Sequence, residues 1–273
     1  MWVLAALTAC TAVARLGGFV GGDAADSVAD PPLWIRALIN AYPSASLTWR
    51  PPDQLIWGDG THMAVGMTRS YRPYNERLSA ATLWDQMSIP YPPGWPYPTP
   101  GENEDPGRLR CYSFFRKLYG DSPEEVRRNL KRIPWLPGGK NCFITFTAVN
   151  GAAEALYRAG EEIARLPNDA RALGGDPKGT YVWRRIEGTD RLSMHSFGAA
   201  IDFRMPGISP PYWRWTTTKP GEPITYPESI QKNEQLRQVV GIFEKYGFIW
   251  GGKWYHFDFM HFEYRPELLY AEK

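Results

Sequence analysis

The chain has 273 residues, which is enough for one or two domains and for a sizeable buried core. Apolar residues make up 43% and charged residues 22%, as in an ordinary soluble globular protein. A net charge of +2, with no block of Lys or Arg, argues against nucleic-acid binding through charge.

The first fourteen residues are apolar and too short to span a bilayer, which takes about 20 residues. They resemble the end of a secretory signal, and Leu7-Thr-Ala-Cys10 resembles a lipoprotein signal that would place a lipid anchor on Cys10. No Lys or Arg precedes this run, so an ordinary N-terminal segment is a third interpretation. We expect residues 1–31 to be a signal-like segment and linker, and the protein to be extracytoplasmic, in the periplasm or cell envelope. No later stretch predicts a transmembrane span.

Residues 32–140 are dense in Pro, Gly and Trp and predict a loop-rich N-terminal extension of unknown role. The proline-rich stretch over 89–100 excludes regular helix and central strand. Short helices are expected among the loops, and one of them has Ser122 as N-cap, Pro123 as its first residue and Glu125 at the third position.

Residues 141–273 change to alternating strand and helix patterns. Helices are predicted over 149–166 and 228–246, the second beginning after Pro227 and ending before Gly247. Strands are predicted over 143–147, 179–186, 199–204, 248–250 and 261–264. The pattern favours an α+β domain, with a small antiparallel sheet flanked by helices.

Cys111 and Cys142 allow two interpretations. An exported protein could join them in a disulfide, or both could be free buried thiols. Neither lies in a CxxC pair, which argues against cysteine-based zinc or redox chemistry.

Two segments near the C-terminus hold metal-binding residue types. Three of the four histidines lie in or beside segments 193–202 and 258–263. His195 and Asp202 come from the first segment and His261 from the second. Two imidazoles and a carboxylate bind Zn²⁺ and leave a fourth position open for water. The pattern therefore predicts a hydrolytic zinc site.

The alternation of side chains along a strand supports this prediction. His261 and Glu263 share one face of their strand, and the aromatic residues beside them share the other. Asp202 stands between two apolar residues, and a carboxylate buried there without a cation would be unfavourable. The alternative is that Asp202 caps a turn or pairs with an arginine, while His261 lies at the surface.

These motifs resemble the M15 zinc peptidases, which include D-alanyl-D-alanine carboxypeptidases and L-alanyl-D-glutamate endopeptidases of bacterial cell-wall metabolism. The resemblance covers residues 141–273 and rests on Ser193, His195, Gly198, Ala200, Asp202, Asp258, His261 and the run Trp250-Gly-Gly-Lys-Trp254. It implies that His195, Asp202 and His261 hold one zinc ion and that Asp258 is the catalytic base.

The family also has an arginine upstream of the first histidine that holds a substrate carbonyl or carboxylate. Arg184 and Arg185 are both placed for this role; alternation allows only one to face the site, and we choose Arg184. The alternative is an arginine in a surface ion pair. Arg69 and Arg72 are weaker candidates.

Three residues remain open between a functional and a structural role. His256 could bind substrate or be a loop histidine, and Ser193 could support the site or belong to a simple turn. Glu263 could orient a ligand or pair with an arginine, and we do not expect it to bind metal. His62 is expected to be structural.

The predicted function is hydrolysis of peptidoglycan stem peptides by metal-activated water, in a monomer whose partner is the peptide substrate. The Asp at 258 and the Trp-Gly-Gly-Lys-Trp run slightly favour the endopeptidase type, while the bond cleaved stays open. The alternatives are a non-catalytic zinc-binding module on the same scaffold and a metal-dependent hydrolase of other amides. A degenerate module should lack the acid at 258.

Overall fold

The computed structural model describes residues 30–66, 72–216 and 222–270. The expected signal-like segment, with Cys10, and the weaker candidate Arg69 lie outside these residues. In the described part no helix is long and apolar enough to cross a membrane.

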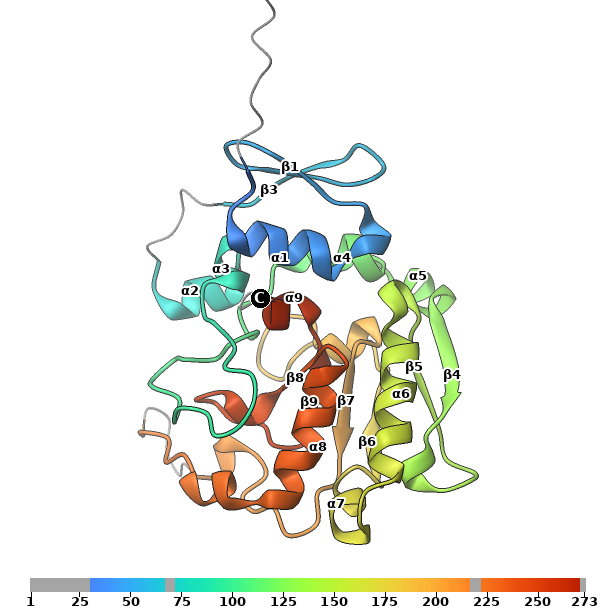
Figure 1. The fold of residues 1–273 in the computed structure, drawn as a ribbon. Helices are drawn as coiled ribbons and strands as arrows, with labels where there is room; N and C mark the ends of the chain where they lie inside the picture. Colours follow the sequence, from blue (N-terminus) through green and yellow to red (C-terminus); the bar gives the residue numbers. More distant parts are fainter. Residues whose placement is uncertain (1–29, 67–71, 217–221, 271–273) are drawn as a thin grey trace, which may run out of the picture.

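The described residues form helices and small antiparallel sheets, an α+β arrangement (Figure 1). The α-helices are α1 (Leu33–Ala41), α2 (Tyr74–Ser79), α3 (Leu83–Met87), α4 (Tyr112–Tyr119), α5 (Pro123–Arg128), α6 (Ala152–Ala164), α7 (Asn168–Leu173), α8 (Glu234–Lys245) and α9 (Pro266–Tyr270). The strands are β1 (Thr48–Arg50), β2 (Gln54–Ile56), β3 (His62–Ala64), β4 (Leu130–Pro134), β5 (Phe143–Thr147), β6 (Pro177–Gly179), β7 (Ala200–Phe203), β8 (Phe248–Trp250) and β9 (His261–Tyr264).

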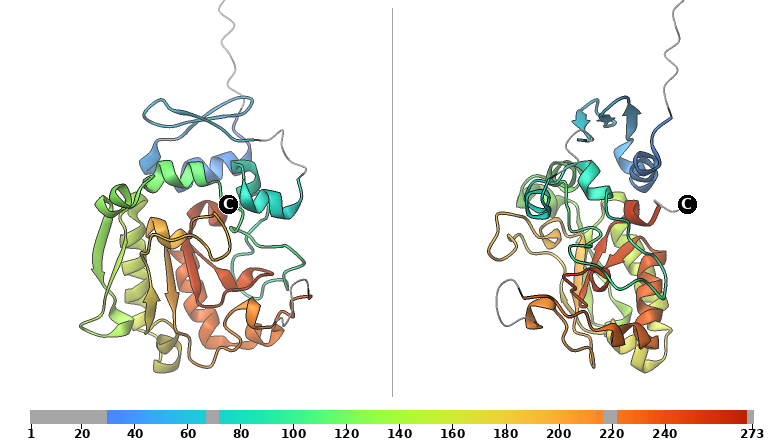
Figure 2. Two further views of the ribbon diagram at one scale, coloured as in Figure 1. Left: turned by 180° about the vertical axis from the view of Figure 1, so that it is seen from behind. Right: turned by 90° about the vertical axis from the view of Figure 1, so that its left-hand side faces the viewer.

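The strands make three antiparallel groups: β1-β2-β3, the hairpin β4-β5, and a four-stranded sheet in the order β6-β7-β9-β8. Helices α6 and α8 contact each other and cover one face of the four-stranded sheet, so that a view from behind exposes its other face (Figure 2, left). Alternate strand residues such as Phe203, Phe248 and Phe262 pack under these helices in one buried core.

Most predicted elements of the C-terminal half are confirmed, with three differences. The strand expected over 179–186 is wrong: β6 ends at Gly179, and the following backbone turns to the segment before β7, with Val182 N donating to His195 O at 3.2 Å. The helix expected over 228–246 is divided, because the Asn233 side chain accepts from Leu236 N and caps a separate helix α8 behind a 3-10 turn. The helix expected from 149 begins at Ala152, because the two preceding residues have positive φ.

The helix caps were predicted correctly. Ser122 accepts a hydrogen bond from Glu125 N at the start of α5, with Pro123 as its first residue. Gly247 has φ +88 and follows the end of α8, where a left-handed residue is favourable for glycine.

The N-terminal half packs against the C-terminal half. Phe115 and Tyr119 of α4 lie against Phe197, with ring centroids 6.1 and 5.9 Å apart. The hairpin β4-β5 spans the expected boundary at residue 141. Cys111 and Cys142 are both free thiols, so they form no disulfide; Cys111 is buried as expected, and Cys142 is only partly buried.

Candidate metal centre

Three side chains from two neighbouring strands and a preceding turn meet on the face of the four-stranded sheet opposite α6 and α8. Asp202 of β7 lies directly opposite His261 of β9 in the strand register. His195 lies in a 3-10 turn before β7, which Ser193 caps by accepting from His195 N at 3.3 Å. Gly198, at φ +63, then turns the chain into β7. One ligand atom from each of the three residues lies within 4.8 Å of the others.

Each imidazole turns one nitrogen toward Asp202 and has the other nitrogen anchored. His195 Nδ1 lies 2.9 Å from the Thr180 carbonyl oxygen, which leaves Nε2 facing Asp202 Oδ2 at 3.1 Å. His195 Nε2 is buried and, among the described residues, makes no well-aligned hydrogen bond. His261 Nδ1 lies 2.7 Å from Asp202 Oδ1 and its Nε2 lies 2.8 Å from Glu263 Oε1. This donor set suits Zn²⁺, and the orphaned nitrogen is the kind of atom that a metal satisfies.

Burial and hydrogen bonds shift the pKa values of His261 and Asp202 in opposite directions. Burial lowers the pKa of His261, but hydrogen bonds to Asp202 and Glu263 outweigh it and raise the pKa to about 10. Burial opposes ionisation of Asp202, yet hydrogen bonds to the two histidines hold its pKa well below the usual range. Two imidazoles thus face a carboxylate that stays ionised, as a cation site requires.

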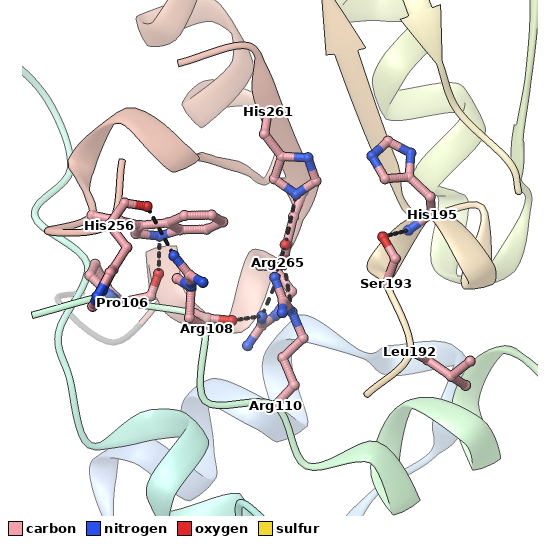
Figure 3. A network of polar contacts seen from close by, with 12 residues as sticks. Pro106, Arg108, Arg110, Leu192, Ser193, His195, His256, His261 and Arg265 are labelled. Atoms are coloured by element: carbon pink, nitrogen blue, oxygen red, sulfur yellow. Dashed lines mark hydrogen bonds and ion pairs between the residues drawn. The ribbon is translucent and has the colours of Figure 1, made fainter. Parts of the chain in front are cut away.

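Glu263 is fully buried and lies behind His261. Arg110 forms an ion pair with Glu263 Oε1, and Arg265 Nη1 lies 3.3 Å from Oε2 (Figure 3). Glu263 therefore pairs with arginines, as one alternative expected, and it also contacts the candidate ligand His261. Arg110 comes from the extension, and its neighbours in the sequence carry no signal of this contact.

Asp258 lies in the loop between β8 and β9, and its backbone N donates to Gly251 O at 3.0 Å. Its Oδ1 is buried and has no hydrogen-bond partner among the described residues. Burial is the largest influence on this carboxyl and raises its pKa to about 6. Asp258 can therefore exchange a proton near neutral pH.

The three metal-binding candidates and Asp258 line one cavity of about 440 Å³. Its walls carry further charged and aromatic side chains: Arg108, Arg110, Arg184, Glu187, Tyr212, Arg214, Trp215 and Trp254. Arg184 and Ser193 line it as expected. Arg185 instead pairs with Asp190 at the surface.

The remaining candidates do not line this cavity. The His256 ring turns to Asp105, with Nδ1 2.6 Å from Oδ2, and packs against Trp213. Arg72 pairs with Asp85, and His62 belongs to β3 of the separate three-stranded sheet.

Residues 187–264 match a family model of the M15 peptidases described as D-alanyl-D-alanine carboxypeptidase. The matched range includes His195, Asp202, Asp258 and His261 and ends at the last residue of β9. Searches of curated proteins and of solved structures found no match. The family match supports an M15 peptidase and confirms the resemblance predicted from the motifs.

Proposed function

We propose that this M15 family peptidase is a zinc-dependent enzyme that hydrolyses peptide bonds of peptidoglycan stem peptides. The observation that carries the proposal is the convergence of three metal-binding side chains and the unpartnered carboxyl of Asp258 in one cavity. We assign the chemistry to residues 141–273, with residues 32–140 as an extension.

His195 Nε2, the Asp202 carboxylate and His261 Nδ1 are the atoms that would hold the zinc ion. When bound, zinc would supply a Lewis acid that makes water more acidic and polarises the scissile carbonyl. The Thr180 carbonyl and Glu263 orient the two imidazoles so that these nitrogens face the site. Both rings are therefore preorganised for the ion. His261, whose pKa is raised to about 10 in the metal-free protein, would release a proton when the ion binds.

Asp258 takes the proton of the attacking water and returns it to the leaving amine. A pKa near 6 suits both steps, since the carboxylate predominates at pH 7 and its conjugate acid is still accessible. Arg184, which lines the same cavity, would stabilise the oxygen that becomes negative during attack. Ser193 supports His195 as a turn cap and can contact substrate, because it also lines the cavity.

The two candidate bonds are D-Ala–D-Ala, cut by a carboxypeptidase, and L-Ala–D-Glu, cut by an endopeptidase. Either activity would take place outside the cytoplasm, where the cell wall lies. A non-catalytic zinc-binding module is disfavoured, because such a module has no need of an ionisable acid at 258. Hydrolysis of another amide is the remaining candidate, and the same assay addresses it.

Mass spectrometry of purified muropeptides incubated with the protein tests the proposal. We expect loss of one D-Ala, or cleavage between L-Ala and D-Glu, that stops with a chelator and returns with added zinc. Asp258→Ala should keep zinc and lose hydrolysis. An unchanged muropeptide profile with zinc-loaded protein would contradict the assignment of substrate.

A further inference from the structure

The segment over 105–111 of the N-terminal extension forms one wall of the candidate site. Three of its residues are tied to the C-terminal half: Pro106 O accepts from Trp254 Nε1 at 2.6 Å, Gly107 O accepts from Arg265 Nη1 at 2.7 Å, and Arg110 pairs with Glu263 (Figure 3). The segment is buried except at Arg108, which is partly exposed. The backbone that carries Arg108 is therefore held rigidly beside the site.

Arg108 lines the cavity and forms no ion pair among the described residues, while its charge acts on the buried carboxyls of Asp105 and Asp258. Its Nη1 donates to the His256 carbonyl oxygen at 2.9 Å, and its guanidinium lies 5.5 Å from the centre of the Trp254 ring. Among the described residues, no carboxylate lies within ion-pair distance of it. The neighbouring Arg110 differs, because Glu263 neutralises it. A fixed guanidinium with free donors is suited to bind an anionic group of a ligand.

Arg108 and Arg184 belong to opposite sides of the site. Arg108 is bonded to the carbonyl two residues before Asp258, on the side of His256 and His261 (Figure 3). The backbone of Arg184 is bonded to Ser193 N and Ser196 Oγ, next to His195. Arg108 is therefore a cavity-lining arginine at the end that holds Asp258, and among the described residues no ion pair joins it to a carboxylate.

Under the proposed function, Asp258 returns a proton to the leaving amine, so the leaving residue must lie at this end. The two candidate bonds share one property there. Terminal D-Ala carries a free α-carboxylate, and so does a D-Glu that continues the peptide through its side-chain carboxyl. In both cases the carboxylate sits on the carbon that bears the leaving amine.

We propose that Arg108 binds the free α-carboxylate of the residue whose amine leaves. The inference rests on the proposed function and deepens it, since it makes the extension a source of substrate specificity. It also narrows the substrate class to peptides with a carboxylate directly after the cleaved bond.

The test uses the pentapeptide L-Ala-γ-D-Glu-L-Lys-D-Ala-D-Ala and two versions of it, one with the D-Glu α-carboxyl and one with the terminal carboxyl as carboxamide. Whichever bond the zinc-loaded full chain cuts, amidation of the residue after that bond should lower kcat/KM about 10–100-fold. Amidation at the other position should have little effect and serves as the internal control. Arg108→Gln, which can still donate to the His256 carbonyl, should abolish the difference between acid and amide.

Arg185→Gln is the matched control, because Arg185 pairs with Asp190 outside the cavity, and it should keep the preference. The inference would be overturned if Arg108→Gln lost the same fraction of its activity on the acid peptide and on the amide peptide. It would also be overturned if Arg184→Gln lost the preference for the acid peptide and Arg108→Gln kept it. Calorimetric binding of the same peptides to Asp258→Asn, with and without Arg108→Gln, separates the two proposals. If no peptide is cut, the proposed function fails. Tighter binding of the acid peptide than of the amide peptide, lost in Arg108→Gln, would still support the carboxylate site. Equal binding of the two peptides would refute it.

Discussion

Replacing Asp258 by Asn should stabilise the metal-free protein at neutral pH while removing its activity. The Asp258 carboxyl has a pKa of about 6 in the fold against 3.8 for the ordinary group, because burial disfavours its charge. At 1.36 kcal/mol per unit of pKa, this difference corresponds to at most about 3 kcal/mol of unfolding free energy. Asn fills the same space and does not ionise.

The sign follows from proton binding. Between about pH 4 and pH 6 the folded protein retains a proton on Asp258 that the unfolded chain has lost. Stability therefore falls as pH rises through this window, and the penalty is complete above the folded-state pKa. Asp258→Asn has no ionisable group at this position, so it does not lose stability in this way. The coupled groups Asp202, His261 and Glu263 titrate in both proteins, so their effects on stability largely cancel in the comparison.

Urea unfolding of chelator-treated protein between pH 4 and pH 7.5 measures the effect. We expect Asp258→Asn to be more stable than the parent by about 1–3 kcal/mol at pH 7.5, with the advantage vanishing near pH 4. Asp190→Asn, at an exposed ion pair, is the control and should change stability by about 0.5 kcal/mol or less. Zinc should still bind Asp258→Asn, with kcat lowered about 10²–10⁴-fold. A variant that is no more stable at pH 7.5, or an advantage independent of pH, would refute the argument from burial.

Three further changes test the site and its support. His195→Ala removes a ligand, so it should abolish both zinc binding in equilibrium dialysis and hydrolysis; retained zinc would exclude His195 from the ligand set. Glu263→Gln replaces the carboxylate that contacts His261 Nε2, and should lower zinc affinity about 10–100-fold in competition with a chelator. Unchanged affinity would mean that Glu263 has a purely structural role. Gly198→Ala places a Cβ 2.5 Å from Leu130 Cδ2 at a positive φ, and should lower the free energy of unfolding by about 1–3 kcal/mol; a neutral change would mean that the turn can relax.

Local patterns were enough to predict the candidate ligand residues and the two strands that carry Asp202 and His261. The alternation in β9 places His261 on one face and Phe262 on the other whatever the rest of the fold does, because side chains in a strand alternate with period two. Helix caps such as Ser122 and Gly247 were predictable for the same reason, since a cap depends on residues within one turn. The strand expected after Gly179 failed because its hydrogen bonds go to the turn around His195 and not to the sheet.

The sequence by itself determined which side chains are available to the candidate site: two imidazoles, a carboxylate and a nearby acid, in spacings that resemble those of a zinc peptidase. Only the tertiary structure decided what surrounds them. Arg110 and Glu263 are 153 residues apart, and Arg108 and His256 are 148 apart, so no local pattern could connect them. The same long-range packing turned His256 toward Asp105 and away from the cavity. Strand and turn propensities act over a few residues. The charged side chains around the candidate site come from segments far apart in the sequence, and only the packing of those segments brings them together.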